Sequence, residues 1–415
     1  MRKTAIIPGI VLVLAVTTVG VFRLLRSTQQ TFNDTDLRPT REQLAIESNG
    51  FPLLLEAGKL LAVTELEESA LSELRTGSSW DEGQARDFLK ANEASLTTMR
   101  RAWLCPHLQV DAITNFDAEF PYLREWRKLT CLTLIEARSS FHGGNETEAF
   151  DMAMEVVRFG HRIEESGGGI LHYLVDSAIK SQGLECLRRF GDDTRLPADK
   201  LLSVARQLKG FEVNQDGLRE ALRVEYATQA DMFDGFPSNF LTNSSGLPIA
   251  APPFVYSATR SKAELAAQIR LTIAAMTNCY AIGMKAIPTA KTNVSPIWLL
   301  LRGNAVGTIL NEMSLSSREK ILARKCRENA SLRATRAVLA LRAFQMTNGR
   351  NPQSLEELLP DFLEAIPLDD YDGKPLRYSP SLKVVYSVGD NLTDDGGVQS
   401  TNRLKSADLV FPFNF

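Results

Sequence analysis

The residues best suited to chemistry form an acidic, glycine-rich stretch near the end of the chain, GDNLTDDGG at residues 389–397. Oxygen-rich loops of this kind suit a hard cation, because calcium takes about six to eight oxygen ligands from carboxylates, carbonyls and water. An acidic β-turn solvated by water alone is the alternative. The stretch therefore predicts a cation-binding loop, and the elements around it must hold that loop in place.

The rest of the chain lacks the spacing of familiar catalytic and metal-binding motifs. The cysteines include no C-x-x-C pair, and the four histidines form no H-E-x-x-H. No G-x-S-x-G occurs, and glycines 167–169 precede no Gly-Lys-Ser/Thr, so they indicate a turn. His161 follows Val157 by one helical turn and is expected to be a satisfied histidine between helices. We therefore expect no enzyme, no catalytic residue and no cofactor-binding residue.

Composition and charge are those of an ordinary globular protein. The chain has 415 residues, 44% apolar and 23% charged, so it can bury a sizeable core in about two to three folded units. Its 47 basic and 50 acidic residues give a net charge of −3, without the concentrated basic face that nucleic-acid binding needs. Buried free thiols are expected at all five cysteines, with one disulfide as the alternative if the body is exported.

The N-terminal segment has the length and the flanking charges of a membrane anchor. Residues 4–22 carry no charged side chain and span about 28 Å as a helix, just enough to cross the hydrocarbon core of a bilayer. Basic residues flank the run on both sides. Counting the α-amino group makes the N-terminal side the more positive one, which by the positive-inside rule predicts an exported body. We expect a transmembrane helix within residues 1–26 and a polar tether at 27–41. A cleaved signal peptide is the alternative.

Residues 42–316 are expected to form an α-helical body, because apolar residues recur there at helical spacing. A helical pattern runs from 85 to 101, with Asn92 as the one polar interruption of its apolar face. Further helices are predicted at 122–142, after the Asn145 cap, at 170–190, from 198 towards 232, and at 256–283. Loops are predicted at about 234–255 and 285–296. Two of these helices resemble one tetratricopeptide-type hairpin, and a generic helical bundle is the alternative.

Residues 317–415 are expected to form a small C-terminal α+β module. One long helix is predicted at 317–348, where Gly349 and Pro352 end it. A short helix follows Ser354 through a capping box. Strands are then predicted at 375–378, 383–388 and 408–411, the first two forming a hairpin. The predicted fold class is therefore mainly α, with a long helix and an antiparallel sheet at the C-terminus.

Several short motifs of this module carry a resemblance to a known family. They are AVLALRAFQMTNGRNPQSLEELLPDFL, IPLDDYDGKPLRY, VVYSVGDN, DDGG and ADLVF, in this order. They resemble the C-terminal region of the major pseudopilin of type II secretion. The resemblance implies a long helix against a small antiparallel sheet, with a calcium ion in the last loop. The whole layout is also similar to uncharacterised single-anchor proteins of planctomycete-like bacteria.

The resemblance assigns the calcium ligands to the acidic positions of this loop. The implied metal-binding residues are Asp390, Asn391, Asp394, Asp395 and Asp408. The sequence departs from the family pattern where Asn391 replaces Asp, where Leu392 replaces Gly, and where Asp370 stands at a position that is commonly Pro. The family's leader signature is also absent, and residues 27–316 separate the apolar segment from the module. We therefore expect a module reused for docking, not a polymerising subunit.

Together these features lead to a functional hypothesis. We expect a single-pass protein of the bacterial inner membrane, largely periplasmic, that is not an enzyme. Its partners are expected to be the membrane and other envelope proteins, in association with a type II secretion-like apparatus. The alternative is an envelope enzyme with a pocket in the helical body. Ionisable residues with perturbed pKa values in a deep pocket favour the enzyme, whereas an exposed apolar groove between helices favours the binding protein.

Overall fold

The structure is a computed structural model that describes residues 32–41, 44–77, 80–236, 255–287, 304–398 and 408–415. The expected anchor at 1–26, part of the tether and most of the two expected loops lie outside these residues. Within the described ranges, no helix combines the length and the apolar character needed to cross a membrane.

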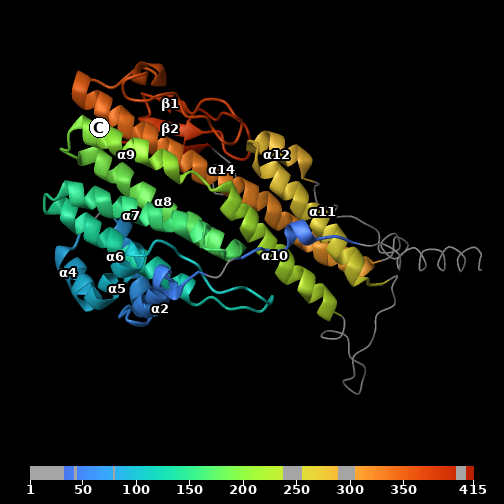
Figure 1. Ribbon diagram of the computed structural model, residues 1–415. Helices are drawn as coiled ribbons and strands as arrows, with labels where there is room; N and C mark the ends of the chain where they lie inside the picture. The colour runs from blue at the N-terminus through green and yellow to red at the C-terminus, as the bar shows by residue number, and fades with distance from the viewer. Residues whose placement is uncertain (1–31, 42–43, 78–79, 237–254, 288–303, 399–407) are drawn as a thin grey trace, which may run out of the picture.

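The chain is mainly helical and carries one small antiparallel sheet, as expected (Figure 1). The α-helices are α2 (Phe51–Lys59), α3 (Glu68–Thr76), α4 (Glu82–Ala91), α5 (Glu93–Leu104), α6 (Tyr122–His142), α7 (Glu146–Glu164), α8 (Ile170–Asp193), α9 (Ala198–Leu208), α10 (Gln215–Gly235), α11 (Ala258–Met276), α12 (Tyr280–Ala286) and α14 (Ala305–Asn348). Short 3-10 helices are η1 (Thr35–Leu37), η2 (Ile46–Ser48), η3 (Glu65–Glu67), η4 (Lys209–Phe211) and η5 (Leu355–Leu358). The strands are β1 (Arg377–Ser379), β2 (Val384–Ser387) and β3 (Leu409–Pro412).

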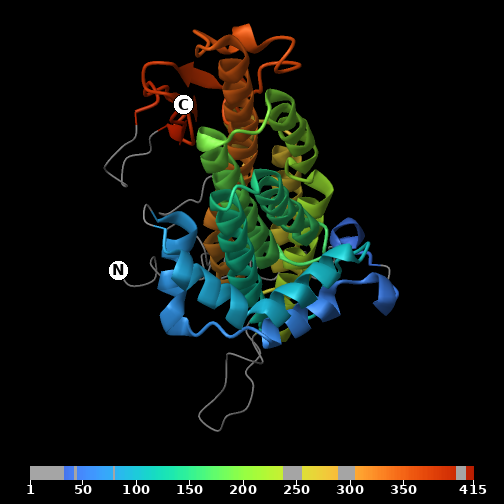
Figure 2. The same ribbon diagram turned by 90° about the vertical axis from the view of Figure 1, so that its left-hand side faces the viewer.

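Helices α6, α7 and α8 pack together at the centre of the body (Figure 2). They confirm the helices predicted at 122–142, after Asn145 and at 170–190. Two glycines let α7 and α8 approach closely. A Cβ atom on Gly183 would lie 2.7 Å from Val157 Cγ2, and one on Gly160 would lie 3.1 Å from the carbonyl oxygen of Asp176. The contact between α7 and α8 therefore admits no larger residue at either glycine without a shift.

The helical pattern predicted from 85 to 101 is divided in two by Asn92. This side chain is buried, and its Oδ1 accepts a hydrogen bond of 2.8 Å from the backbone N–H of Ala62. Its Nδ2 donates to the carbonyl of Phe88, so the amide completes the end of α4. The polar interruption of the apolar face thus marks a helix boundary and fixes a neighbouring loop.

The second half of the expected tether packs against the body. Leu37 in η1 is buried in a cluster with residues of α10 and α11. The hydroxyl of Tyr226 donates to Asp34 at 2.7 Å, and Arg270 forms an ion pair with Asp36 at 2.6 Å. Residues 32–41 are therefore held in place by α10 and α11.

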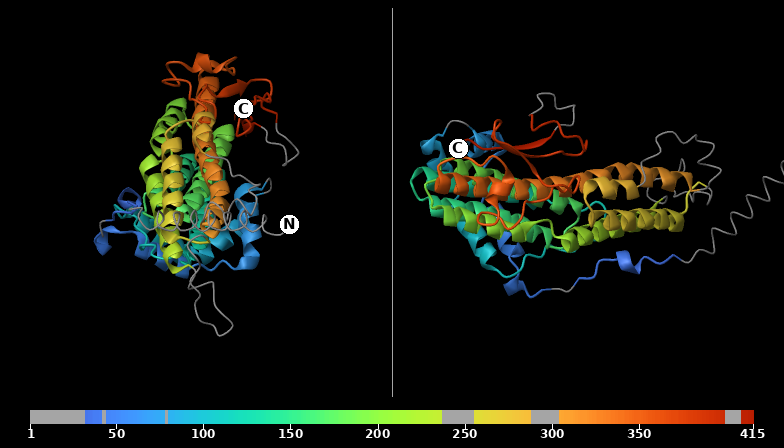
Figure 3. Two further views of the ribbon diagram at one scale, coloured as in Figure 1. Left: turned by 90° about the vertical axis from the view of Figure 1, so that its right-hand side faces the viewer. Right: turned by 90° about the horizontal axis from the view of Figure 1, so that it is seen from above.

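Helix α14 joins the body to the C-terminal module. It begins at Ala305, before the expected boundary at 316/317, and Gly349 ends it in the left-handed conformation that the sequence predicted. It packs against α8, α9 and α11 and also against β2 and β3 (Figure 3). One hydrophobic cluster contains buried residues of both the body and the module, from Phe51 in α2 to Phe413 after β3. The C-terminal module therefore shares its long helix and its core with the body.

The three strands form an antiparallel sheet in the order β1–β2–β3. Arg377 pairs with Tyr386 in the predicted hairpin, and Tyr386 pairs with Val410 of the last strand. Val385 is fully buried against the core. All five cysteines are free thiols, as expected, but only Cys131 and Cys326 are buried, whereas Cys105, Cys186 and Cys279 are partly exposed.

Candidate functional site

The acidic C-terminal loop is largely exposed. Asp390, Asn391, Asp394 and Asp395 lie on the surface, whereas Asp408 is buried at the start of β3. Asn391 Nδ2 donates to Asp395 Oδ2 at 3.0 Å. Asp408 Oδ2 accepts from the N–H of Gly397 at 2.7 Å, and its Oδ1 has no partner among the described residues.

The predicted calcium ligands are therefore only partly brought together. Burial raises the pKa of Asp408, and the charges of Asp394 and Asp395 raise it further, so these acids are near neighbours. Asp394 is 3.7 Å from the guanidinium of Arg377. Within the described ranges, the only three acids whose oxygens lie within 4.8 Å of one another are elsewhere, in the helical body.

Two other aspartates fix the loop before the sheet, one within the C-terminal module and one against α14. Asp369 is fully buried and accepts hydrogen bonds from the N–H of Val388 and the hydroxyl of Ser387. Asp370 forms an ion pair with Lys325 of α14 at 2.9 Å. The departure from the family pattern at Asp370 thus has a structural role, because this carboxylate ties the loop before the sheet to the long helix.

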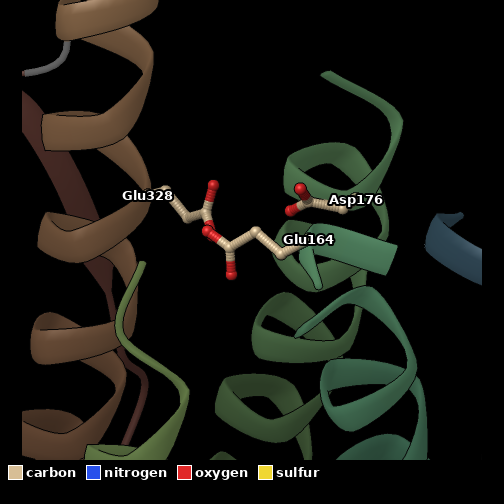
Figure 4. Close-up of side chains that lie close together, drawn as sticks. All are labelled: Glu164, Asp176 and Glu328. Carbon is tan, nitrogen blue, oxygen red and sulfur yellow. The ribbon is translucent and has the colours of Figure 1, made fainter. Parts of the chain in front are cut away.

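The group of three acids in the body surrounds a buried lysine. Lys180 Nζ donates to Glu164 Oε2 and to Glu328 Oε1, both at 2.6 Å, and lies 3.7 Å from Asp176 Oδ1. None of the four side chains is more than 3% exposed. Figure 4 shows the three carboxylates turned towards one another from α7, α8 and α14. We call these four residues the carboxylate–lysine cluster.

Three helices contribute the residues of the carboxylate–lysine cluster. Glu164 is the last residue of α7, and Asp176 and Lys180 are one turn apart on α8. Gly160 makes room for the lysine, because a Cβ atom there would lie 2.6 Å from Lys180 Cγ. Glu328 reaches the cluster from α14, so three helices separated in sequence meet at one ammonium group.

The charges of the carboxylate–lysine cluster do not balance. Burial raises the pKa of Asp176 and of Glu328, and their carboxylate neighbours raise both further, while Lys180 acts in the opposite direction. Burial would lower the pKa of Lys180, but the three acids outweigh burial and raise it. The lysine therefore stays charged, and one ammonium group faces three carboxyl groups in a dry environment.

Hydrogen bonds satisfy one of the three acids and leave the other two incomplete. Besides Lys180, Glu164 accepts from His161 Nδ1 at 3.1 Å and from the N–H of Asn214 at 3.0 Å. This contact confirms that His161 is a satisfied histidine. Both oxygens of Asp176 and Glu328 Oε2 have no hydrogen-bond partner among the described residues. The hydroxyl of Tyr173, on the same face of α8 as Asp176, is also buried without one.

A pocket of about 570 Å³ opens beside the carboxylate–lysine cluster, between α8, α10, α11, α14 and the segment before α6. Its apolar wall is formed mainly by Ile113, Phe120, Leu174, Leu222, Ile269 and Ile321. An adjoining depression shares Phe120, Leu174 and Arg324 with this pocket. None of the four residues of the carboxylate–lysine cluster lines either cavity.

The polar groups of the pocket are few. His172 Nε2 lies 2.8 Å from the hydroxyl of Tyr122, and burial lowers the pKa of His172 to about 4, so this ring is neutral near pH 7. Glu225 accepts a hydrogen bond from the amide of Gln229. Arg324 has a buried Nε without a hydrogen-bond partner, and it forms no ion pair with any residue that the structure describes.

Comparison of the chain with protein-family models, curated proteins and solved structures found no match.

The sequence did contain a signal for the cluster that the motif search missed. Tyr173, Asp176, Lys180, Leu184 and Leu187 follow one another at helical spacing, and all five side chains are buried. An acid and a lysine one turn apart inside an otherwise buried stripe predict an internal ion pair. Nothing in the linear sequence showed that Glu164 and Glu328 complete it.

Proposed function

We propose that this protein is a non-enzymatic binding protein of the bacterial envelope, anchored in the inner membrane through residues 1–26 with its body in the periplasm. Its helical body binds an anionic amphiphile, a molecule with an apolar body and one acidic group, in the pocket between α8, α10 and α14. The observation that carries this proposal is Arg324, a cation in an apolar cavity of ligand size that forms no ion pair with any described residue.

The volume and the lining of the pocket are typical of a small-molecule site. Such sites have volumes of about 300 to 1,000 Å³, with mostly apolar walls and a few polar groups that orient the ligand. The volume here is about 570 Å³. Lys320 lies one turn before Arg324 on α14 and also lines the cavity, so two cations face it against the single acid Glu225. An acidic headgroup complements this charge, and an apolar chain complements the wall.

An enzymatic alternative is less well supported. Residues with perturbed pKa values do occur in the body, but those of the carboxylate–lysine cluster are closed off from the pocket. The pocket itself offers a neutral His172 bonded to Tyr122, and no nucleophile paired with a base lines it. A general base must be able to reach the substrate proton. This arrangement favours binding over catalysis.

For the C-terminal module we propose docking to other envelope proteins, in association with a type II secretion-like apparatus. The proposal rests on the sequence resemblance, and the antiparallel sheet beside the end of a long helix supports it. We also propose calcium binding in the loop through Asp390, Asn391, Asp394, Asp395 and Asp408. The buried Oδ1 of Asp408, which has no hydrogen-bond partner within the described part of the chain, supports this site, because a calcium ion would complete its contacts.

Ligand displacement tests the pocket. The full chain in zwitterionic nanodiscs is loaded with anilinonaphthalene sulfonate, an apolar fluorophore with one acidic group, and titrated with decanoate, decanol or decylamine. Empty nanodiscs supply the background. We expect decanoate to displace the dye best. Removing the charge with Arg324→Gln is expected to weaken decanoate binding about tenfold to a hundredfold, the usual worth of a hydrogen bond to a charged group.

The matched control is Arg327→Gln, because Arg327 is exposed on the same helix and does not line the pocket. We expect this variant to bind decanoate as the wild type does. An equal loss of decanoate affinity in both variants would show that the effect is not specific to the pocket. Equal displacement by all three decyl compounds would contradict an anionic headgroup site, and no displacement would contradict the proposed function as a whole.

A further inference from the structure

We propose that Glu164, Asp176 and Glu328 bind one hard divalent metal ion, of the Mg²⁺, Mn²⁺ or Ca²⁺ class, beside Lys180 in the core of the helical body. This metal site is independent of the proposed amphiphile pocket and of the proposed calcium loop. Three observations support it: the charge balance of the cluster, the oxygens without a hydrogen-bond partner in it, and the separation between carboxylate oxygens of the three acids.

Charge balance calls for a second cation. Three ionised carboxylates and one ammonium group leave two negative charges uncompensated, and all four side chains are almost completely buried. Uncompensated charge in a protein interior is strongly unfavourable, so such groups pair, bind metal or take up protons. One divalent cation would neutralise the carboxylate–lysine cluster completely. Protonation of two carboxyl groups is the competing solution.

The unpaired oxygens are available for a metal. Lys180 donates hydrogen bonds to Glu164 Oε2 and Glu328 Oε1, whereas both oxygens of Asp176 and Glu328 Oε2 have no hydrogen-bond donor among the residues that the structure describes. Asp176 is completely buried and its carboxylate points into the cluster (Figure 4). Buried polar atoms in proteins are rarely left without a partner. The hydroxyl of Tyr173 is a further unpaired oxygen close to these acids, whose charges raise its pKa beyond the effect of burial.

The separation of the acids fits a single ion. Their ligand oxygens lie within 4.8 Å of one another. Two oxygens on opposite sides of one ion lie about 4 to 5 Å apart, which is twice the usual metal–oxygen distance for Mg²⁺ and Ca²⁺. An all-oxygen ligand set also selects this class of metal, because softer metals prefer thiolate and imidazole ligands. Among the described residues, no cysteine or histidine belongs to the group.

The pocket lies about one helical turn from this site. His172 and Arg324 line the cavity, and each precedes a residue of the group by one turn, Asp176 on α8 and Glu328 on α14, which is about 5.4 Å along each helix axis.

Manganese binding by the full chain tests the site. The protein in nanodiscs is stripped with chelator, dialysed, and titrated with Mn²⁺ at pH 7.5, with bound metal measured by elemental analysis and free Mn²⁺ by electron paramagnetic resonance. We expect one equivalent to bind at the body site. Asp176→Asn is expected to weaken that site at least about tenfold, because it removes a charged ligand and no hydrogen bond.

Two further variants make the result decisive. Asp151→Asn changes an exposed acid of α7 and is expected to bind Mn²⁺ as the wild type does. Glu328→Gln, which can still accept from Lys180, is expected to weaken the site as Asp176→Asn does, so one misfolded variant does not decide the outcome. If the stripped wild type binds no Mn²⁺, or if both cluster variants bind it normally, protons balance the charge and the proposal is wrong.

Discussion

The two acidic regions of this chain use the same residue types in opposite surroundings. In the C-terminal loop, four of the five predicted ligands are exposed, Asn391 bonds to Asp395, and Asp394 lies near Arg377 of β1. In the body, Glu164, Asp176 and Glu328 come from three helices and meet at Lys180 without access to solvent. Water can solvate the charges of the loop, whereas those of the cluster must be balanced by Lys180 together with protonation or a further cation.

The difference shows why an acidic run is a weak guide to a binding site. A dense acidic run is easy to recognise in a sequence. Its carboxylates can all face solvent, however, where an ionised group costs little free energy and needs no partner. A buried acid is rarer and needs compensation wherever it occurs. Variants that change charge should therefore affect the two regions very differently.

Lys180→Met is expected to have the largest effect. It removes the only ammonium group that contacts three buried carboxylates, and leaving buried charges unpaired typically costs about 3 to 5 kcal/mol. We expect the free energy of unfolding, measured with urea in the presence of chelator, to fall by that amount. The control Lys59→Met alters an exposed lysine and should change it by less than about 0.5 kcal/mol. Equal stability of the two variants would contradict the role of Lys180 in compensating the buried carboxylates.

Gly160→Ala is expected to have the next largest effect. Its Cβ atom would lie 2.6 Å from Lys180 Cγ and 3.1 Å from the carbonyl of Asp176, so α7 and α8 must move apart. Overpacking of this kind costs about 1 to 3 kcal/mol. Gly210→Ala is the matched control, because nothing lies within 4 Å of a Cβ atom there. A loss of stability in the control but not in Gly160→Ala would contradict the described contact between the two helices.

The metal-free protein is expected to lose stability as the pH rises. Burial raises the pKa of Asp176 in the folded state, so the folded state holds this proton at pH values where the unfolded state releases it. Unfolding then becomes easier as the pH rises above the ordinary aspartate pKa, by up to about 1.4 kcal/mol per pH unit for one proton. Urea unfolding from pH 5 to 8 in chelator should show this slope in wild type and a smaller slope in Asp176→Asn. An identical slope in both proteins would remove Asp176 as its source.

Asp395→Asn in the loop is expected to have the smallest effect. Asp395 is exposed, so without calcium the substitution should change the free energy of unfolding by less than about 0.5 kcal/mol. If the loop binds calcium, the melting temperature of the wild type rises on calcium addition, and Asp395→Asn reduces that rise. Asp390→Asn serves as a second loop variant. A loss of stability comparable to that of Lys180→Met would break the contrast between the two regions.

Much of the fold could be predicted because its helices have strong local signals. The apolar spacing of 122–142, the glycines at 143–144 and the Gly349 cap each act within a few residues, and each prediction is confirmed. Asn92 was recognised as an interruption, but its role in ending α4 depends on a distant backbone group at Ala62. The start of α14 at Ala305 was missed, because an element boundary carries a weaker signal than its interior.

The carboxylate–lysine cluster could not be predicted in the same way. Lys180 and Glu328 are 148 positions apart, and only the packing of α8 on α14 brings them together. The buried Asp369 could not be predicted either, because it accepts a hydrogen bond from Ser387, which lies 18 positions later at the end of β2. Local patterns predict elements, whereas the compensation of buried charge depends on tertiary contacts between them.

The most direct test is the position of a metal ion bound to the full chain. An anomalous difference map from crystals grown with Mn²⁺ locates the ion without reference to any variant. We expect a peak between Asp176 and Glu328, within bonding distance of carboxylate oxygens of the cluster. A peak at the C-terminal loop alone, or no peak in the helical body, would contradict the claim that the buried carboxylates need a second cation.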